Sequence, residues 1–185
     1  RRKSKVDDDI EKYSVMRAKM AVDRADVCVI MIDATEGFTE QDSKVAGYAH
    51  EQGKACIIAV NKWDSIEKDE KTMNKYLKDI GMELKYMDYA PCCFISALTG
   101  QRITRMLEMI NTVHENHALR ISTGVLNEVL IEATAMQQPP SDKGRQLRLY
   151  YMTQVSVKPP TFVIFVNERE LFHFSYRRYI ENQLR

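Results

Sequence analysis

Several features that would mark particular classes of protein are missing from the sequence. The longest uncharged apolar run is Val27–Ile32, which is far shorter than the roughly 20 residues of a membrane-spanning helix. The basic start, residues 1–12, is not followed by an apolar stretch or a small-residue cleavage site, and it is therefore not a secretory signal. No internal repeat or low-complexity segment occurs. We therefore expect a cytoplasmic protein that has no membrane partner.

Cysteine is scarce, and neither sign of charge dominates. The chain has four cysteines, Cys28, Cys56, Cys92 and Cys93, and none of them has the C-x-x-C spacing typical of zinc sites. We expect buried free thiols and no metal site. The net charge is +1, but residues 118–185 carry nine Lys and Arg against six Asp and Glu. That excess fits either an anionic partner for the second part of the chain or a solvated surface.

The length of 185 residues, with 44% hydrophobic and 29% charged residues, indicates two small globular domains. In residues 1–117, helical patterns alternate with short apolar runs. The expected helices lie at about residues 8–24, 42–52, 69–80 and 102–116, and the expected strands at residues 27–32, 54–60 and 92–95. Because the strand patterns are continuously apolar, both faces of the sheet are expected to be covered. The pattern predicts an α/β fold, a parallel sheet with flanking helices and right-handed crossovers.

The order of elements changes near Ala118. A helix is expected at residues 121–136, followed by a polar loop that ends at Gly144. Strands are expected at residues 146–155 and 162–167, and a closing helix from about Ser175 onward. We therefore predict a separate small α+β domain over residues 118–185.

Two short segments follow neighbouring strands of the predicted parallel sheet. The first comprises Asn61, Lys62, Trp63 and Asp64, and the second comprises Ser96, Ala97 and Leu98. Ligands of doubly wound α/β sheets bind at the carboxyl ends of the strands, so the two segments are expected to converge on one small, flat ligand. The alternative for the first segment is an ordinary polar turn favoured by Asn and Asp.

The residue types in these segments suit the edge of a guanine base. The Asp64 carboxylate can accept from the ring N–H and the exocyclic amino group, and the Asn61 amide can donate to the ring nitrogen on the other edge. The stem of Lys62 can cover the base face, and the backbone N–H of Ala97 can donate to the carbonyl oxygen. Adenine has an amino group at that last position, and an unpaired buried donor costs about 1–3 kcal/mol. Such a site would therefore reject adenine nucleotides.

These segments resemble the base-specificity motifs N-K-x-D and S-A-x of Ras-like, P-loop GTPases. More closely, the whole chain is similar to the bacterial double-Era-like GTPases, the Der or EngA family, which repeat the G domain in tandem and end in a KH-like domain. The similar stretches are RRKSKVDDDIEKYSVMRA, EGFTEQDSKVAGYA, VNKWD, FISALTGQR, GRQLRLYYMTQVSVKPPTFVIFVN and HFSYRRYIENQLR. The resemblance implies GTP or GDP as ligand, Mg²⁺ in the intact protein, and assembly of the large ribosomal subunit, with ribosomal RNA as a partner.

The chain also departs from that family. It has no G-x-x-x-x-G-K-[ST] loop for phosphates and Mg²⁺, and no D-x-x-G. The resemblance places Arg1 just after the D-x-x-G motif, and a KH-like domain would continue past Arg185. We therefore expect the C-terminal portion of a G domain at residues 1–117 and a truncated KH-like domain at residues 118–185. As a monomer, this fragment would recognise guanine without hydrolysing GTP, and no catalytic residue is assigned.

The second domain lacks the G-x-x-G backbone clamp with which KH domains hold single-stranded RNA. Arg177 and Arg178 are expected at the start of the closing helix, where the helix dipole disfavours cations. They are predicted either to contact RNA phosphates or to lie on an ordinary surface. The adjacent Tyr150 and Tyr151 either pack or stack on bases. The alternative to a GTPase part is a non-catalytic module that binds RNA or the ribosome and uses the α/β half as scaffold.

Overall fold

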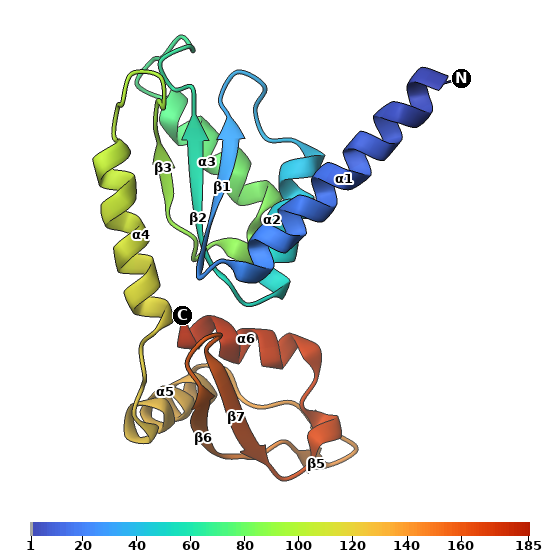
Figure 1. Cartoon of the computed structure of the whole chain (residues 1–185). Coiled ribbons are helices and arrows are strands. Elements are labelled where there is room, and N and C mark those ends of the chain that lie inside the picture. Colours follow the sequence, from blue (N-terminus) through green and yellow to red (C-terminus); the bar gives the residue numbers. More distant parts are fainter. Residues whose placement is uncertain (1) are drawn as a thin grey trace. The chain divides into compact units, whose positions relative to one another are not determined.

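The computed structural model describes the backbone of residues 2–185 and the side chains of residues 13–185 (Figure 1). Arg1, with its predicted place just after a D-x-x-G motif, lies outside the described residues. The chain divides into two compact units, Arg1–Asn116 and His117–Arg185. Each has its own core, and each is described by itself.

The first unit is built on a three-stranded parallel sheet. The strands β1 (Val27–Asp33), β2 (Ala55–Asn61) and β3 (Cys92–Phe94) follow the order β1-β2-β3. The central strand β2 is buried at every position except its last residue, Asn61. This burial explains the continuously apolar sequence of β2, since both of its faces lie under helices. The predicted α/β architecture is confirmed.

Alternate residues of the strands pack into two separate hydrophobic cores, one on each face of the sheet. On one face, Ile30, Cys56 and Ile58 pack with residues of α2 (Glu40–Glu51) and α3 (Thr72–Glu83), joined by the end of α1 (Arg2–Arg24). On the other face, Ile57 and Ala59 pack against α4 (Ile103–His117). Figure 1 shows α4 alone on its side of the sheet and α2 and α3 on the other. The helices cover both faces of the sheet and leave the carboxyl ends of the strands open.

Local hydrogen bonds explain where two of these helices begin. α2 follows Thr39, whose hydroxyl accepts from the Asp42 backbone N–H while the Asp42 carboxylate accepts from the Thr39 N–H, which is a capping box. α3 begins three residues later than expected. Asp69, the expected first residue, instead accepts hydrogen bonds from the Lys71 N–H and the Thr72 hydroxyl. A short acidic side chain that bonds the following backbone favours a turn over a helix interior.

All four cysteines lie on the three strands of this sheet and are free thiols. Cys28 and Cys56 are direct neighbours in the β1–β2 register and are both buried. The hydrogen bond from Cys56 lowers the pKa of Cys28 to about 7 and raises the pKa of Cys56. Burial raises the pKa of Cys92 to about 12 and also raises that of Cys93.

The second unit packs two helices on one face of an antiparallel strand pair. Its elements are α5 (Thr123–Met136), β6 (Leu149–Ser156), β7 (Thr161–Val166) and α6 (Phe174–Leu184). The core is formed by apolar residues of both helices and of the inner face of β6, among them Leu126, Leu130, Met152 and Ile180. These elements follow the predicted order.

A small hairpin in the second unit was not expected from the sequence. The strands β4 (Ser141–Asp142) and β5 (Arg145–Gln146) pair through a two-residue turn. Lys143 and Gly144 in that turn have φ of 48° and 79°, the positive values that tight two-residue hairpin turns require. The expected loop to Gly144 and strand from residue 146 are therefore wrong in detail, since β6 begins only at Leu149. Among the described residues, no helix is both long enough and apolar enough to cross a membrane.

Candidate functional site

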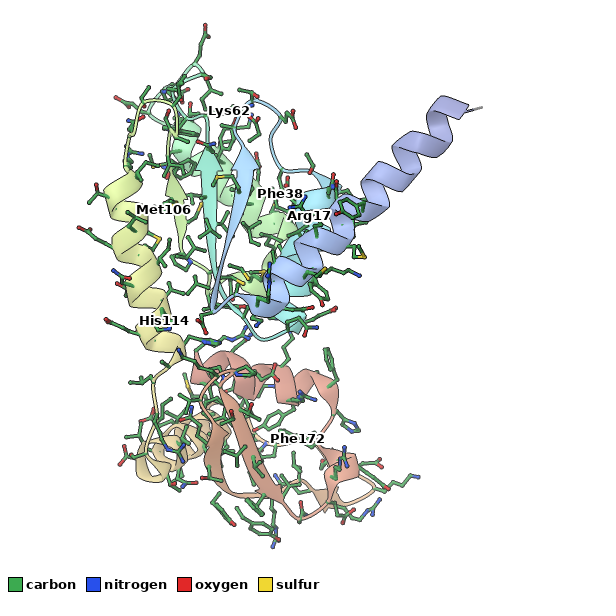
Figure 2. The ribbon with its side chains drawn as sticks, viewed as in Figure 1. Arg17, Phe38, Lys62, Met106, His114 and Phe172 are labelled. Carbon is green, nitrogen blue, oxygen red and sulfur yellow. The ribbon has the colours of Figure 1, made fainter. Side chains whose placement is uncertain are left out.

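The two predicted segments lie together at the carboxyl ends of the parallel strands. Asn61 is the last residue of β2, and the chain after β3 returns beside it. The Ile95 N–H donates to the Val60 carbonyl at 2.8 Å, and the Trp63 N–H donates to the Ile95 carbonyl at 3.0 Å. Figure 2 shows Lys62 at this edge of the sheet, beyond the ends of β1 and β2. The convergence expected from the strand order is therefore present.

A hydrogen bond joins Asn61 to Ala97 across the two loops. The Asn61 Oδ1 atom accepts from the Ala97 backbone N–H at 3.0 Å. Because an amide has one oxygen and one NH₂ group, this bond fixes the oxygen toward Ala97 and leaves the NH₂ group to donate elsewhere. In this arrangement the Ala97 N–H is donated to Asn61. Asn61 therefore positions the second loop as well as offering a donor of its own.

Asp64 is exposed and carries an anionic carboxylate. A hydrogen bond from Ser96, which is fully buried, is the main cause that lowers the pKa of Asp64. Ser65 also donates to the Asp64 Oδ2 atom at 3.1 Å, and the nearby Lys68 lowers the pKa further. An ionised carboxylate only accepts hydrogen bonds. Asp64 is thus prepared to receive two donors from a ligand at neutral pH.

Ser96 itself belongs to the frame of the site. Its hydroxyl accepts from the Thr99 N–H at 3.1 Å, and its backbone N–H donates to the Gln101 carbonyl at 3.2 Å. These bonds hold the turn after β3 in place. The buried Ser96 hydroxyl thus has both the Thr99 N–H and Asp64 as hydrogen-bond partners. It orders the loop without contacting solvent.

Lys62 has an unusual backbone and a fixed side chain. Its φ of 59° lies in the left-handed region, which is uncommon for residues other than glycine. The ammonium group forms an ion pair with Asp33, the last residue of β1. This contact is the main reason that the pKa of Asp33 falls to about 2 and that of Lys62 rises. The Thr35 N–H and hydroxyl also donate to the Asp33 Oδ1 atom, at 2.9 and 2.7 Å.

Asp33 is a site residue that the sequence reasoning did not include. The parallel register pairs it directly with Asn61, so its carboxylate lies at the same edge as the predicted loops. The signal was present, because an acidic residue closes the apolar run at Val27–Ile32. The strand order needed to read that signal is known only from the fold.

Trp63 and Leu98 differ from the other predicted residues in where their side chains lie. The Trp63 ring is 3% exposed and packs on Phe94 and Tyr76, with ring centroids 4.3 and 5.3 Å away. Its side chain belongs to the core, and only its backbone reaches the site edge. Leu98 is 88% exposed, so its side chain is open to a ligand or to solvent.

Arg177 and Arg178 lie in α6 of the second unit. Both are exposed, and Arg177 forms an ion pair with Glu181 one turn later at 3.3 Å. Among the side chains of residues 13–185, no group of three or more His, Cys, Asp or Glu is arranged to hold a metal ion.

Comparison with known families identifies the class of protein that this fold and site define. The family model described as "Elongation factor Tu GTP binding domain" matches residues 13–116, more than half of the chain. The chain therefore belongs to this family of GTP-binding domains. Residues 120–185 match the model described as "KH-domain-like of EngA bacterial GTPase enzymes, C-terminal", and a KH-like second domain is thus confirmed.

The particular proteins that the chain resembles are those called GTPase Der. It is 62% identical to GTPase Der of Lachnoclostridium phytofermentans and 62% identical to that of Acetivibrio thermocellus, over 185 residues in each case. These alignments cover 100% of the chain and 42% of each relative. The resemblance to the Der (EngA) family is confirmed.

The chain also aligns with solved structures of GTP-binding proteins. The chain aligns with Era in complex with MgGDPNP and a segment of 16S ribosomal RNA, with a TM-score of 0.47, 20% identity, and coverage of 92% of this chain and 63% of that one. It aligns with a probable GTP-binding protein engB with a TM-score of 0.46, 21% identity, and coverage of 60% of this chain and 69% of that one.

Proposed function

We propose that this chain is part of a GTP-hydrolysing protein of the Der type that acts in assembly of the large ribosomal subunit. Its first part, residues 1–117, selects the guanine base of GTP or GDP, and its second part, residues 118–185, contacts ribosomal RNA. The similarity to GTPase Der along the whole chain supports this proposal. The proposal concerns a longer protein, since the chain spans 42% of those relatives.

The observation that carries the proposal is the arrangement of Asn61, Asp64 and Ala97 at one edge of the sheet. Asp64 presents an ionised carboxylate for the two N–H groups of guanine, and Asn61 presents an NH₂ group for the ring nitrogen on the opposite edge. The Ala97 N–H, now bonded to Asn61, is shared with the guanine carbonyl oxygen. Adenine has no N–H groups at the edge that faces Asp64 and presents an amino group to the Ala97 N–H, so these two pairings are lost or reversed, while the ring nitrogen that faces Asn61 is the same in both bases. Polar groups left unpaired in the complex disfavour adenine.

The phosphates of the nucleotide and Mg²⁺ are assigned to no residue of this chain. The sequence has no G-x-x-x-x-G-K-[ST] loop, and the described side chains do not form a cluster suited to a metal ion. We therefore assign guanine recognition to these residues and no step of hydrolysis. GTP turnover by this polypeptide would contradict that assignment.

Replacing Asp64 with Asn tests the guanine site directly. Saturation-transfer NMR titrations with guanosine, xanthosine and adenosine probe base recognition without depending on phosphate contacts. We expect the unaltered chain to prefer guanosine. Asp64→Asn should bind guanosine about 10- to 150-fold more weakly, because it loses charge-assisted hydrogen bonds. The xanthine carbonyl can accept from the new amide, so the preference should move toward xanthosine.

Glu67→Gln is the matched control, because Glu67 is an exposed acidic residue in the same loop. It should leave all three affinities unchanged. If Asp64→Asn also changes nothing, the guanine site is wrong. The non-catalytic module that binds RNA or the ribosome would then be the better account of the chain.

A further inference from the structure

The outer face of the β6–β7 strand pair is unusually apolar for an exposed surface. Its aromatic and branched side chains are between 37% and 54% exposed: Tyr151, Val155, Val163 and Phe165. We call this set the aromatic face. The opposite face of β6 supplies the core, where Met152 and Gln154 are buried under the helices of the unit. The aromatic face therefore plays no part in the core of its own unit.

Two rings at the centre of the aromatic face are arranged as a stack. Tyr151 and Phe165 are partners in the antiparallel register. Their ring centroids are 4.2 Å apart and their planes differ by 12°. Both side chains remain about two-fifths exposed, at 44% and 42%. Flat rings held parallel at an open surface are what a further planar group requires for stacking.

The only charged residues in the segment that contains the two strands of the aromatic face are positively charged. Between Asp142 and Glu168 the sequence has no carboxylate, and its charged residues there are Lys143, Arg145, Arg148 and Lys158. Arg145 is neutralised by Glu168 at 2.7 Å. The exposed Arg148 precedes β6, and Lys158 lies exposed in the turn between the strands. A cation thus flanks the face at each end of β6.

We propose that the aromatic face binds an unpaired segment of RNA, with bases stacking on Tyr151 and Phe165 and phosphates meeting Arg148 and Lys158. This inference rests on the proposed function, in which the second unit contacts ribosomal RNA. Sheets that present aromatic rings between basic residues bind single-stranded nucleic acid, since every base has a face to stack and a phosphate to neutralise. A protein partner or a second copy would match the apolar surface, but it would not account for the lack of carboxylates.

The binding mode predicts a preference for unpaired RNA. Bases in a duplex are stacked on one another and offer their faces to no side chain. The unit has no G-x-x-G clamp. The aromatic face therefore supplies the surface for single-stranded RNA in its place. A single-stranded RNA should therefore bind more tightly than a duplex of the same length.

The experiment measures fluorescence anisotropy of a labelled 12-nucleotide single-stranded RNA and of a matched duplex with the 185-residue chain. Tyr151→Leu and Phe165→Leu remove the rings but keep apolar side chains on the strands. Each should weaken single-strand binding about 5- to 150-fold, the usual effect of losing one stacking ring. Phe174→Leu is the control, since Phe174 is a 77% exposed ring in the same unit but outside the strands. It should change the affinity less than twofold.

A second set of variants tests the phosphate contacts. Arg148→Gln and Lys158→Gln should each lower the slope of log K against log salt by roughly 0.7, the value for one contact to a single strand. Val163→Glu places a carboxylate on the aromatic face and should weaken binding even if a leucine variant proves unstable. Arg177→Gln with Arg178→Gln is measured beside them, because a loss of slope there reports phosphate contacts on α6 independently of the aromatic face.

The outcomes separate this inference from the proposed function. If the unaltered chain binds RNA and the ring variants bind it equally well, RNA does not bind at the aromatic face. RNA would still be a partner of the chain. If sedimentation shows self-association that the leucine variants abolish while RNA affinity is unchanged, the face is a protein contact and the inference is overturned. If the unaltered chain binds no RNA, the RNA partner fails too, while guanosine selectivity is tested separately through Asp64.

Discussion

At the scale of single residues, the contact between Asp33 and Lys62 links β1 to the loop that follows β2. Lys62 has a left-handed φ of 59° in this loop. Lys62 and Asp64 are exposed, and Trp63 between them is buried. Asp33 then holds the Lys62 ammonium group at the site edge. The loop is therefore held by the Asp33–Lys62 ion pair and by the buried Trp63 ring.

We predict that Asp33→Asn weakens guanosine binding roughly two- to fivefold, the range for an exposed ion pair, because Lys62 loses its anchor over the base face. In a Lys62→Met background, Asp33→Asn should have no further effect, since the residue acts through Lys62. NMR titration of the four proteins of this cycle gives the coupling. Glu40→Gln, which breaks an exposed ion pair with Lys44 on α2, should leave binding unchanged. Equal losses in both backgrounds would contradict a positioning role.

The ion pair between Asp33 and Lys62 makes the free energy of unfolding depend on pH. Lys62 and Thr35 lower the pKa of Asp33 to about 2 in the folded chain, below the ordinary aspartate value of about 4. A lowered folded pKa gives stability that is present above the unfolded pKa and is lost as the pH falls through the folded value. The Asp33 contribution is thus complete above about pH 4 and disappears toward pH 2. Asp33→Asn should therefore reduce the pH dependence of the free energy of unfolding between about pH 4 and pH 2, which denaturation at a series of pH values measures.

Individual site residues differ in how far the sequence predicts them. Asn61, Asp64 and Ala97 could be placed because a strand end is visible in the pattern of apolar residues, and strand ends share one edge in a parallel sheet. Their roles toward a nucleotide remain proposals. The burial of Trp63 and the contact of Asp33 could not be predicted, since they depend on a backbone turn and on which strands are neighbours. Both are properties of tertiary structure.

At the scale of elements, the pattern of apolar residues predicted most helices and strands of the chain. The exceptions occur where polar side chains or turn geometry decide the boundary. Asp69 delays α3 because its carboxylate bonds the backbone ahead of it. The β4–β5 hairpin depends on positive φ at Lys143 and Gly144, and a lysine gives little indication of such a conformation. Hydrophobic periodicity contains no information on either feature.

Helix α2 provides a test at this scale. Thr39→Ala should lower the free energy of unfolding by about 1 kcal/mol, since it removes the hydroxyl that accepts the Asp42 N–H. Chemical denaturation followed by Trp63 fluorescence measures this change. Thr112→Ala is the control, because it removes the same atoms from the exposed interior of α4 and should be neutral or slightly stabilising. Equal effects of the two substitutions would show that the capping box contributes nothing.

At the scale of the whole molecule, the division into two units that do not share a core predicts two separate unfolding events. Trp63 is the single tryptophan of the chain and lies in the core of the first unit. Leu126 is fully buried in the second unit. Leu126→Ala should destabilise the second unit by about 2–5 kcal/mol. We expect its far-ultraviolet circular dichroism transition to shift while the Trp63 fluorescence transition remains in place.

Ile80→Ala is the matched substitution in the first unit, where Ile80 is 5% exposed in the core that contains Trp63. It should shift the fluorescence transition. If Leu126→Ala instead moves both signals together, the two units unfold as one cooperative body and the division into independent cores is wrong.

The reactivity of the four free thiols of the sheet reports on how often its strands separate. A thiol reacts with an alkylating reagent as the thiolate, and these thiols are covered in the closed sheet, Cys28, Cys56 and Cys93 almost entirely. Alkylation therefore requires a strand to separate from its neighbour, and the alkylation rate measures how often this local opening occurs. When β1 leaves β2, the hydrogen bond from Cys56 that lowers the pKa of Cys28 is broken, so Cys28 and Cys56, which are partners in the register, become accessible together. The order in which the cysteines are modified thus records the order in which the strands part, with no introduced label.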